Sequence, residues 1–173
     1  MLRRLTMALA LGFALALISA TAIKAQQVVY SSDNVEYSLE LPSSAWRVIQ
    51  EPDSVHQHAE FIYGDRNDGF LRVRKEIVDA GTTVSDLARR DQEQKLRFQT
   101  GYVEGKEEQF SGRLKGITLA YEYTSGGKQM AGRLYYLQAD NRTIYALRFT
   151  GLRDKLARIR NQTDSIARSF HLK

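Results

Sequence analysis

Residues 117–150, ITLAYEYTSGGKQMAGRLYYLQADNRTIYALRFT, decide the fold of this chain. The segment Ser125-Gly126-Gly127-Lys128 predicts a tight hairpin, because paired glycines readily adopt the positive φ angles of a two-residue primed turn. Folding there places three pairs of residues on one face: Tyr121 with Gly132, Leu119 with Leu134, and Ile117 with Tyr136. A slip of one residue would break all three pairs, so this pattern specifies the register.

A second turn near residues 140–142 brings the chain back along this hairpin. We expect Tyr145, Leu147 and Phe149 of the following strand to continue the face that carries Tyr121. The predicted unit is a three-stranded antiparallel meander with one apolar face rich in tyrosine.

Further strands and two helices are predicted around the meander. The segments with strand patterns are residues 28–30, 35–41, 46–49, 59–63 and 70–78. A helix capped by Thr83 is expected to run to about Gln99, and apolar residues spaced by four and three predict a second helix over residues 152–170. We expect this second helix to cover the tyrosine-rich face. The predicted class is α+β, with helices packed on a largely antiparallel sheet.

The first 25 residues predict a cleaved signal peptide. Arg3 and Arg4 precede an apolar run of about a dozen residues, which is shorter than the roughly 20 needed to span a bilayer. The small residues allow cleavage after Ala22 or after Ala25. We therefore expect one domain over residues 26–173, in the periplasm or secreted.

The composition excludes several classes of protein. There is no cysteine, which rules out disulfides, thiolate metal sites and cysteine nucleophiles. Loss of Arg3, Arg4 and Lys24 with the leader leaves 22 Lys and Arg against 20 Asp and Glu. This near balance does not give the strong positive charge that is typical of proteins that bind nucleic acid. The basic residues of the last helix are spread around its polar side, so membrane association is peripheral at most.

Asp91 interrupts the apolar arc of the first helix. Departures from local patterning are enriched at functional sites, so Asp91 is a candidate binding residue. The structural alternative is that Asp91 lies at the wet edge of the helix or pairs with an arginine. This alternative is the favoured interpretation, because structural ion pairs account for such carboxylates as readily as function does.

The other candidate binding residues are predicted to share the second face of the meander: Glu122, Arg133, Tyr135 and Arg148. Thr118 is expected beside them. Tyr and Arg are enriched among the residues that dominate binding interfaces, so this face suits a partner or ligand. A sheet face covered by loops is an equally good interpretation.

Metal and catalytic motifs are weak or missing. His56, His58 and Glu60 would share one face of a strand, as a divalent cation requires, but a closed site needs a fourth ligand. We interpret them as polar residues at the beginning of a strand, and we predict no metal and no cofactor. The sequence has no Gly-x-Ser-x-Gly elbow, no His-Glu-x-x-His motif and no phosphate-binding glycine loop, so no catalytic residues and no enzyme activity are predicted.

The opening and closing segments carry a resemblance to a known family. Tyr37-Ser38-Leu39-Glu40-Leu41-Pro42 is followed by Trp46, and the chain closes on Ser169-Phe170-His171-Leu172 after an amphipathic helix. With a helix between two groups of strands, residues 28–172 resemble the PsbP-like superfamily, which includes extrinsic photosystem II subunits and DcrB-like bacterial envelope proteins. The resemblance implies an α/β/α sandwich that serves as a non-catalytic binding or assembly module. It supplies no site residues for this sequence.

Two functional hypotheses follow from these features. The first is an exported, non-catalytic module that docks to a protein partner in the cell envelope. The alternative is a carrier of a small ligand, with an apolar, tyrosine-lined pocket between a helix and the sheet. The sequence leaves the oligomeric state open.

Overall fold

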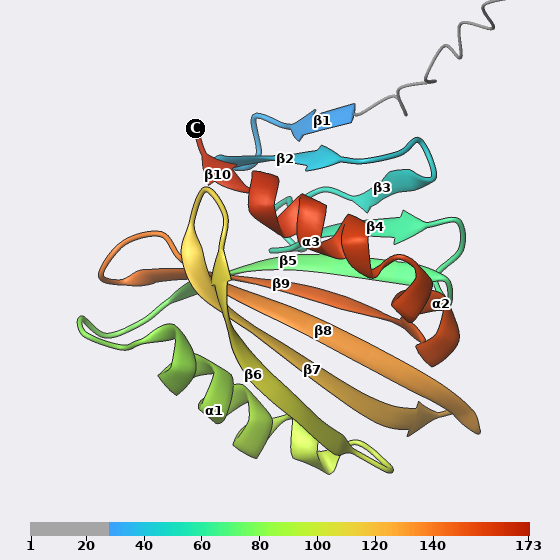
Figure 1. Ribbon diagram of the computed structural model, residues 1–173. Coiled ribbons are helices and arrows are strands. Elements are labelled where there is room, and N and C mark those ends of the chain that lie inside the picture. Colours follow the sequence, from blue (N-terminus) through green and yellow to red (C-terminus); the bar gives the residue numbers. More distant parts are fainter. Residues whose placement is uncertain (1–27) are drawn as a thin grey trace, which may run out of the picture.

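A computed structural model describes residues 28–173 of the chain, and the predicted signal peptide lies outside these residues (Figure 1). Two antiparallel sheets form the body of the domain. The small sheet has the order β1 (Val28–Ser31), β2 (Tyr37–Leu41), β10 (His171–Leu172). The large sheet has the order β3 (Trp46–Gln50), β4 (Ala59–Tyr63), β5 (Gly69–Ile77), β9 (Thr143–Leu152), β8 (Lys128–Gln138), β7 (Lys115–Ser125), β6 (Val103–Ser111).

The helices are α1 (Val84–Gln94), followed by a 3₁₀ turn (Leu96–Phe98), and the consecutive helices α2 (Arg153–Arg158) and α3 (Arg160–Ser169). Helix α1 begins with a capping box, in which Thr83 and Asp86 each bond the other's backbone N–H. The predicted α+β class is confirmed.

The register of the central hairpin is as predicted. Tyr121 lies opposite Gly132, and Leu119 lies opposite Leu134. A Cβ atom at Gly132 would lie only 2.0–2.4 Å from atoms of the Tyr121 ring, so the aromatic ring covers bare glycine backbone. This contact fixes which side chains of β7 and β8 share a face.

The predicted face of the third meander strand is wrong. Arg148 lies opposite Leu134, so Tyr145, Leu147 and Phe149 point to the side opposite Tyr121. The cause is that β9 is buried on both faces: Ile144 and Ala146 are as completely buried as Leu147. When both faces are apolar, alternation does not say which residues share a face with the neighbouring strand.

The helices therefore cover opposite faces of the large sheet. Helix α1 packs on the face of Leu119 and Tyr136, here called the α1 face, whereas α2 and α3 pack on the face of Tyr135 and Phe149, here called the α3 face. The expectation that the C-terminal helix covers Tyr121 is thus wrong, and α1 takes that place. The α/β/α arrangement is met in part, since the small sheet packs beside α3 as an additional element (Figure 1).

Both helices differ in detail from their predicted extents. Helix α1 ends at Gln94 and not at the expected Gln99; beyond it, Leu96 enters the core whereas Phe98 is 73% exposed. The C-terminal helix breaks at Ile159, where φ is −100° and ψ is 14°. Leu152, the first residue of the predicted stripe, ends β9 instead and is half-buried. The other residues of the stripe are buried: Leu156, Ile159, Thr163, Ile166 and Phe170.

The opening and closing segments meet in the fold. Trp46 Nε1 donates a hydrogen bond of 3.0 Å to Gln162 Oε1, and the Glu40 N–H donates one of 2.9 Å to Ser169 Oγ. The Phe170 ring packs against Tyr37 and Tyr145, with ring centroids 4.8 and 4.9 Å apart. These contacts attach α3 and the small sheet to the large one, and they leave the β6 end of the α3 face uncovered.

Candidate functional site

The α3 face carries an open cleft beside α2. Helix α2 lies over β8 and β9, and beyond it the sheet continues through β7 to the edge strand β6 (Figure 1). A hollow of about 490 Å³ lies between the helix and these strands. Its lining includes Gly105, Ala120 and Ala131, whose small size leaves room for the hollow and keeps its floor apolar.

The rim of the cleft is charged. Glu122 forms an ion pair with Arg153 of α2, with a nitrogen–oxygen distance of 3.3 Å. Arg133 forms a second ion pair with Asp164 of α3, at 3.2 Å. Arg160, the first residue of α3, also lines the hollow. An apolar centre surrounded by a polar, charged rim is the usual composition of a protein–protein interface.

Tyr135 lies beneath this rim and is not part of the surface. Its side chain is fully buried, and its hydroxyl donates a hydrogen bond to the Asp164 carboxylate. Arg133 Nε in turn donates a hydrogen bond of 2.6 Å to the Tyr135 hydroxyl oxygen. Burial, together with the hydrogen bond to Asp164, raises the pKa of Tyr135, so the phenol stays neutral. Thr118 is also buried, so the open polar face expected from the sequence is closed over these two residues.

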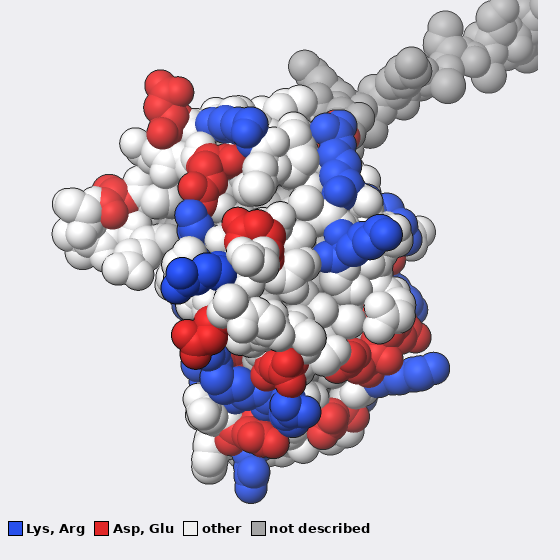
Figure 2. All heavy atoms as spheres, turned by 90° about the vertical axis from the view of Figure 1, so that its left-hand side faces the viewer, with Lys and Arg blue, Asp and Glu red and all other residues white. Residues whose placement is uncertain are grey.

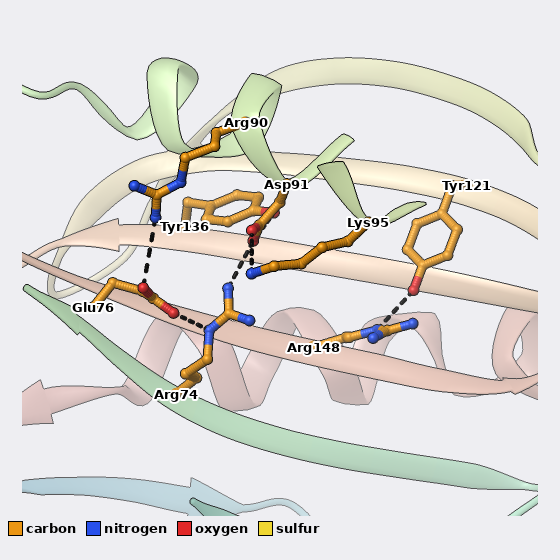
Figure 3. Close-up of polar contacts among 8 residues, drawn as sticks. All are labelled: Arg74, Glu76, Arg90, Asp91, Lys95, Tyr121, Tyr136 and Arg148. Carbon is orange, nitrogen blue, oxygen red and sulfur yellow. Dashed lines mark hydrogen bonds and ion pairs between the residues drawn. The ribbon is translucent and has the colours of Figure 1, made fainter. Parts of the chain in front are cut away.

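Asp91 lies on the α1 face at the centre of an ion-pair network (Figure 3). Its side chain is 5% exposed; Oδ2 accepts from Arg74 at 2.7 Å and from the Tyr136 hydroxyl at 3.1 Å, and Oδ1 accepts from Lys95 at 2.8 Å. Burial alone would raise the pKa of Asp91, but the Lys95 hydrogen bond and the Arg74 charge outweigh it and lower the pKa. The interpretation that Asp91 pairs with an arginine is confirmed.

Arg148 lies on the same face as Asp91 and not with Arg133, contrary to the prediction from the sequence. It donates a 2.8 Å hydrogen bond from Nε to the Tyr121 hydroxyl. Together Asp91 and Arg148 line a small hollow of about 60 Å³ between α1 and the sheet. The five predicted residues are thus divided: Glu122 and Arg133 at the cleft, Tyr135 buried, and Asp91 and Arg148 at the small hollow.

Several residues at these sites were not predicted. Arg153 and Arg160 belong to the basic residues of the last helix, which the sequence predicts to be exposed to solvent. Their spacing of seven residues could have indicated that they lie on the same side of that helix. Arg74 and Lys95 complete the Asp91 network, and Lys95 stands four residues after Asp91, the usual spacing of a helical ion pair.

The histidine cluster does not assemble as a metal site in the described part of the chain. His56 Nδ1 lies 3.2 Å from Asp53 at the surface, and His58 lines the small hollow. Among residues 28–173, no three His, Asp or Glu side chains gather as metal ligands. No helix in this range has the length and apolarity to cross a bilayer.

Charges on the surface are mixed. On the face shown in Figure 2, Lys and Arg side chains alternate with Asp and Glu, and neither sign forms a continuous patch.

No protein-family model matches the chain, and no curated protein matches its sequence. Solved structures do match. The solution structure of cyanobacterial PsbP (CyanoP) from Synechocystis superposes with a TM-score of 0.56 at 15% identity, covering 92% of this chain and 99% of that one. The chain has the PsbP-like fold.

Two further solved structures are similar to this chain. LpqN of Mycobacterium tuberculosis, described as involved in cell envelope biogenesis, has a TM-score of 0.56 at 16% identity over 86% of this chain and 91% of that one. A crystal structure from Bacteroides thetaiotaomicron has a TM-score of 0.57 at 12% identity, and this chain spans 49% of its length. At these identities the likeness establishes the fold, while the function has to be argued from the sites.

Proposed function

We propose that this chain is an exported binding module without catalytic activity, which docks to a protein partner in the cell envelope through the cleft beside α2. The predicted signal peptide supports export. LpqN, a protein of similar fold that is described as involved in cell envelope biogenesis, supports a role in the envelope.

The observation that carries the proposal is the uncovered end of the α3 face. The aromatic core under α3 is closed, yet the same sheet face opens into a hollow of about 490 Å³ that α2 and the first residue of α3 flank. The floor offers Ala120 and Ala131, and Arg153 and Arg160 stand at the rim. A partner segment that places small apolar side chains on the floor and carboxylates at the rim fits this chemistry.

The edge strand β6 adds a second means of attachment. It pairs with β7 on one side and forms the end of the large sheet, so its other side presents backbone N–H and C=O groups. An extended partner segment can hydrogen-bond to such an edge while its side chains occupy the cleft.

Ala157 allows a direct test, because it is exposed on α2 and lines the cleft. We expect Ala157→Trp to fill the hollow without disturbing the core. Arg158→Trp is the matched control, since its side chain is 73% exposed on the same helix and does not line the cleft. In pull-downs from envelope extract, a partner should be captured by the wild type and by Arg158→Trp, and lost with Ala157→Trp. Equal capture by all three would refute the docking site.

A small-ligand carrier is the second candidate. The cleft volume lies within the roughly 300–1,000 Å³ of small-molecule pockets, which favours it. The pocket differs from the tyrosine-lined one expected, because Tyr135, Tyr136 and Tyr145 are buried in the two cores. Native mass spectrometry of the protein purified from its own envelope separates the two: a small molecule retained by the wild type and absent from Ala157→Trp favours the carrier.

A further inference from the structure

The small hollow on the α1 face is lined mainly by cations. Arg72, Arg74, Lys95 and Arg148 line it with a single carboxylate, Asp91. Arg72 on β5 stands directly opposite Arg148 on β9. Like charges at directly facing positions of an antiparallel pair destabilise a sheet, so each of these two arginines needs a nearby negative charge to offset the repulsion.

Arg72 is compensated within the protein and Arg148 is not. Glu60 of β4 lies on the other side of Arg72, with an Arg72 nitrogen 2.7 Å from its carboxylate. Among residues 28–173, Arg148 has no carboxylate at ion-pair distance, and its hydrogen bond is the one to Tyr121. Burial raises the pKa of Tyr121 to about 12, against the opposing effect of Arg148, so the partner of Arg148 is a neutral hydroxyl.

The carboxylates of the network are already occupied. Both oxygens of Asp91 accept from Arg74, Lys95 or Tyr136, as Figure 3 shows, and Glu76 is shared between Arg74 and Arg90. The network of the hollow and its partners contains six Lys and Arg and three carboxylates: Arg66, Arg72, Arg74, Arg90, Lys95, Arg148, Glu60, Glu76 and Asp91. Positive charge is therefore in excess, and Arg148 is the cation of this network that has no carboxylate partner among residues 28–173.

His58 adds an uncharged donor to the same wall. Its Nδ1 atom is buried and forms no hydrogen bond with the described residues. Burial, and then the nearby Arg72 charge, lower the pKa of His58, so the imidazole is neutral at pH 7. A neutral imidazole carries one N–H, which can donate to an anion beside Arg148.

We propose that this hollow binds a phosphate group, with the free terminal nitrogens of Arg148 as its principal contact and Lys95, Arg72 and His58 around it. Two parallel N–H donors of a guanidinium match two oxygens of a phosphate. The volume of about 60 Å³ admits a group of a few heavy atoms, since one water molecule takes about 30 Å³ of liquid. The excess of positive charge in this network also favours a phosphate dianion. The site is independent of the cleft, which lies on the opposite face of the sheet.

The experiment is a titration of the ¹⁵N-labelled domain with inorganic phosphate, followed by amide shifts and by the His58 ring resonances at constant ionic strength. Glycerol 3-phosphate is a second ligand, and acetate and chloride are controls for charge screening. We expect saturable shifts at Leu134, Ala146 and His58, with an upward shift of the His58 pKa as the anion binds. Glycerol 3-phosphate binding as well as phosphate would identify the end of a phosphate ester as the ligand, and binding of inorganic phosphate alone would identify the free ion.

Variants make the assignment specific to Arg148. Arg148→Gln should weaken phosphate binding about tenfold or more, Lys95→Gln, at a half-exposed side chain, several-fold, and the distant Arg158→Gln should leave it unchanged. Retained amide dispersion of each variant shows that the fold is intact. Shifts that stay linear with concentration, equal shifts with acetate or chloride, or wild-type affinity in a folded Arg148→Gln or Lys95→Gln would each overturn the proposal.

Discussion

Two adjacent tyrosines of β8 perform the same task on opposite faces of the sheet. The Tyr136 hydroxyl bonds to Asp91 of α1, and the Tyr135 hydroxyl bonds to Asp164 of α3. The first aspartate also pairs with Arg74, and the second pairs with Arg133. Each helix is thus fastened to the centre of the sheet by a tyrosine, an aspartate and an arginine.

The two fastenings differ in how far they are closed to solvent. The Asp91 side chain is 5% exposed and bound by two cations, whereas the Asp164 side chain is 27% exposed and bound by one. Helix α3 is held mainly by an aromatic core, so its polar fastening can lie at the rim of the cleft. The comparison shows that a similar polar group is structural where it is enclosed and accessible to a partner where it borders an opening.

The largest effect is expected from breaking the enclosed fastening. Asp91→Ala leaves Arg74 and the Tyr136 hydroxyl without their buried acceptor and should lower the free energy of unfolding by about 3 kcal/mol. Urea denaturation followed by circular dichroism measures this. Glu93→Ala, at an exposed position of the same helix, is the control and should change stability by less than about 0.5 kcal/mol. A similar loss in both variants would show that Asp91 has no special role.

A smaller effect is expected at the cleft. Asp164→Ala removes a partly solvated carboxylate, and water can replace it at Arg133, so the loss should be about 1 kcal/mol. The same denaturation experiment gives the value. If Asp164→Ala were as destabilising as Asp91→Ala, the distinction between the two fastenings would be wrong.

The smallest effect is the pH dependence of the Asp91 fastening. The folded pKa of Asp91 is lowered from an unfolded value near 3.8, so its stabilisation is complete well above pH 3.8 and is lost as the pH falls through the lower folded pKa. The stability difference between the wild type and Asp91→Asn should stay constant from about pH 7 to 5 and narrow below pH 3.8. A difference that narrows already near pH 6 would instead indicate a raised pKa.

The sequence predicts well which residues pair across a hairpin, but it predicts poorly which side chains of neighbouring strands share a face of the sheet. The paired glycines at Gly126 and Gly127 set the β7–β8 register, which is confirmed from Ile117 to Tyr136. The next pairing failed because the third strand is apolar on both faces. That single error moved the C-terminal helix and Arg148 to the wrong sides of the sheet.

Strand β6 was not predicted for a different reason. Residues 103–111 contain three glutamates and a lysine, and Phe110 is their one buried side chain. A charged edge strand is protected from aggregation but loses the alternation that identifies strands. The cleft could not be predicted without it, because β6 forms one wall. The partners of Asp91 depend on the long-range packing of α1 on β7 and β8, which brings Asp91 to Tyr136 and Arg74.

The central claim, that the cleft beside α2 receives a partner in the envelope, is tested most directly by photocrosslinking in living cells. A photoreactive benzoyl-phenylalanine is introduced at Ala157, inside the cleft, or at Arg158, one residue further on the same helix. We predict a discrete covalent adduct with another envelope protein from position 157 and none from position 158. Adducts of equal yield from both positions, or none from position 157 in a folded and exported protein, would contradict the proposed docking site.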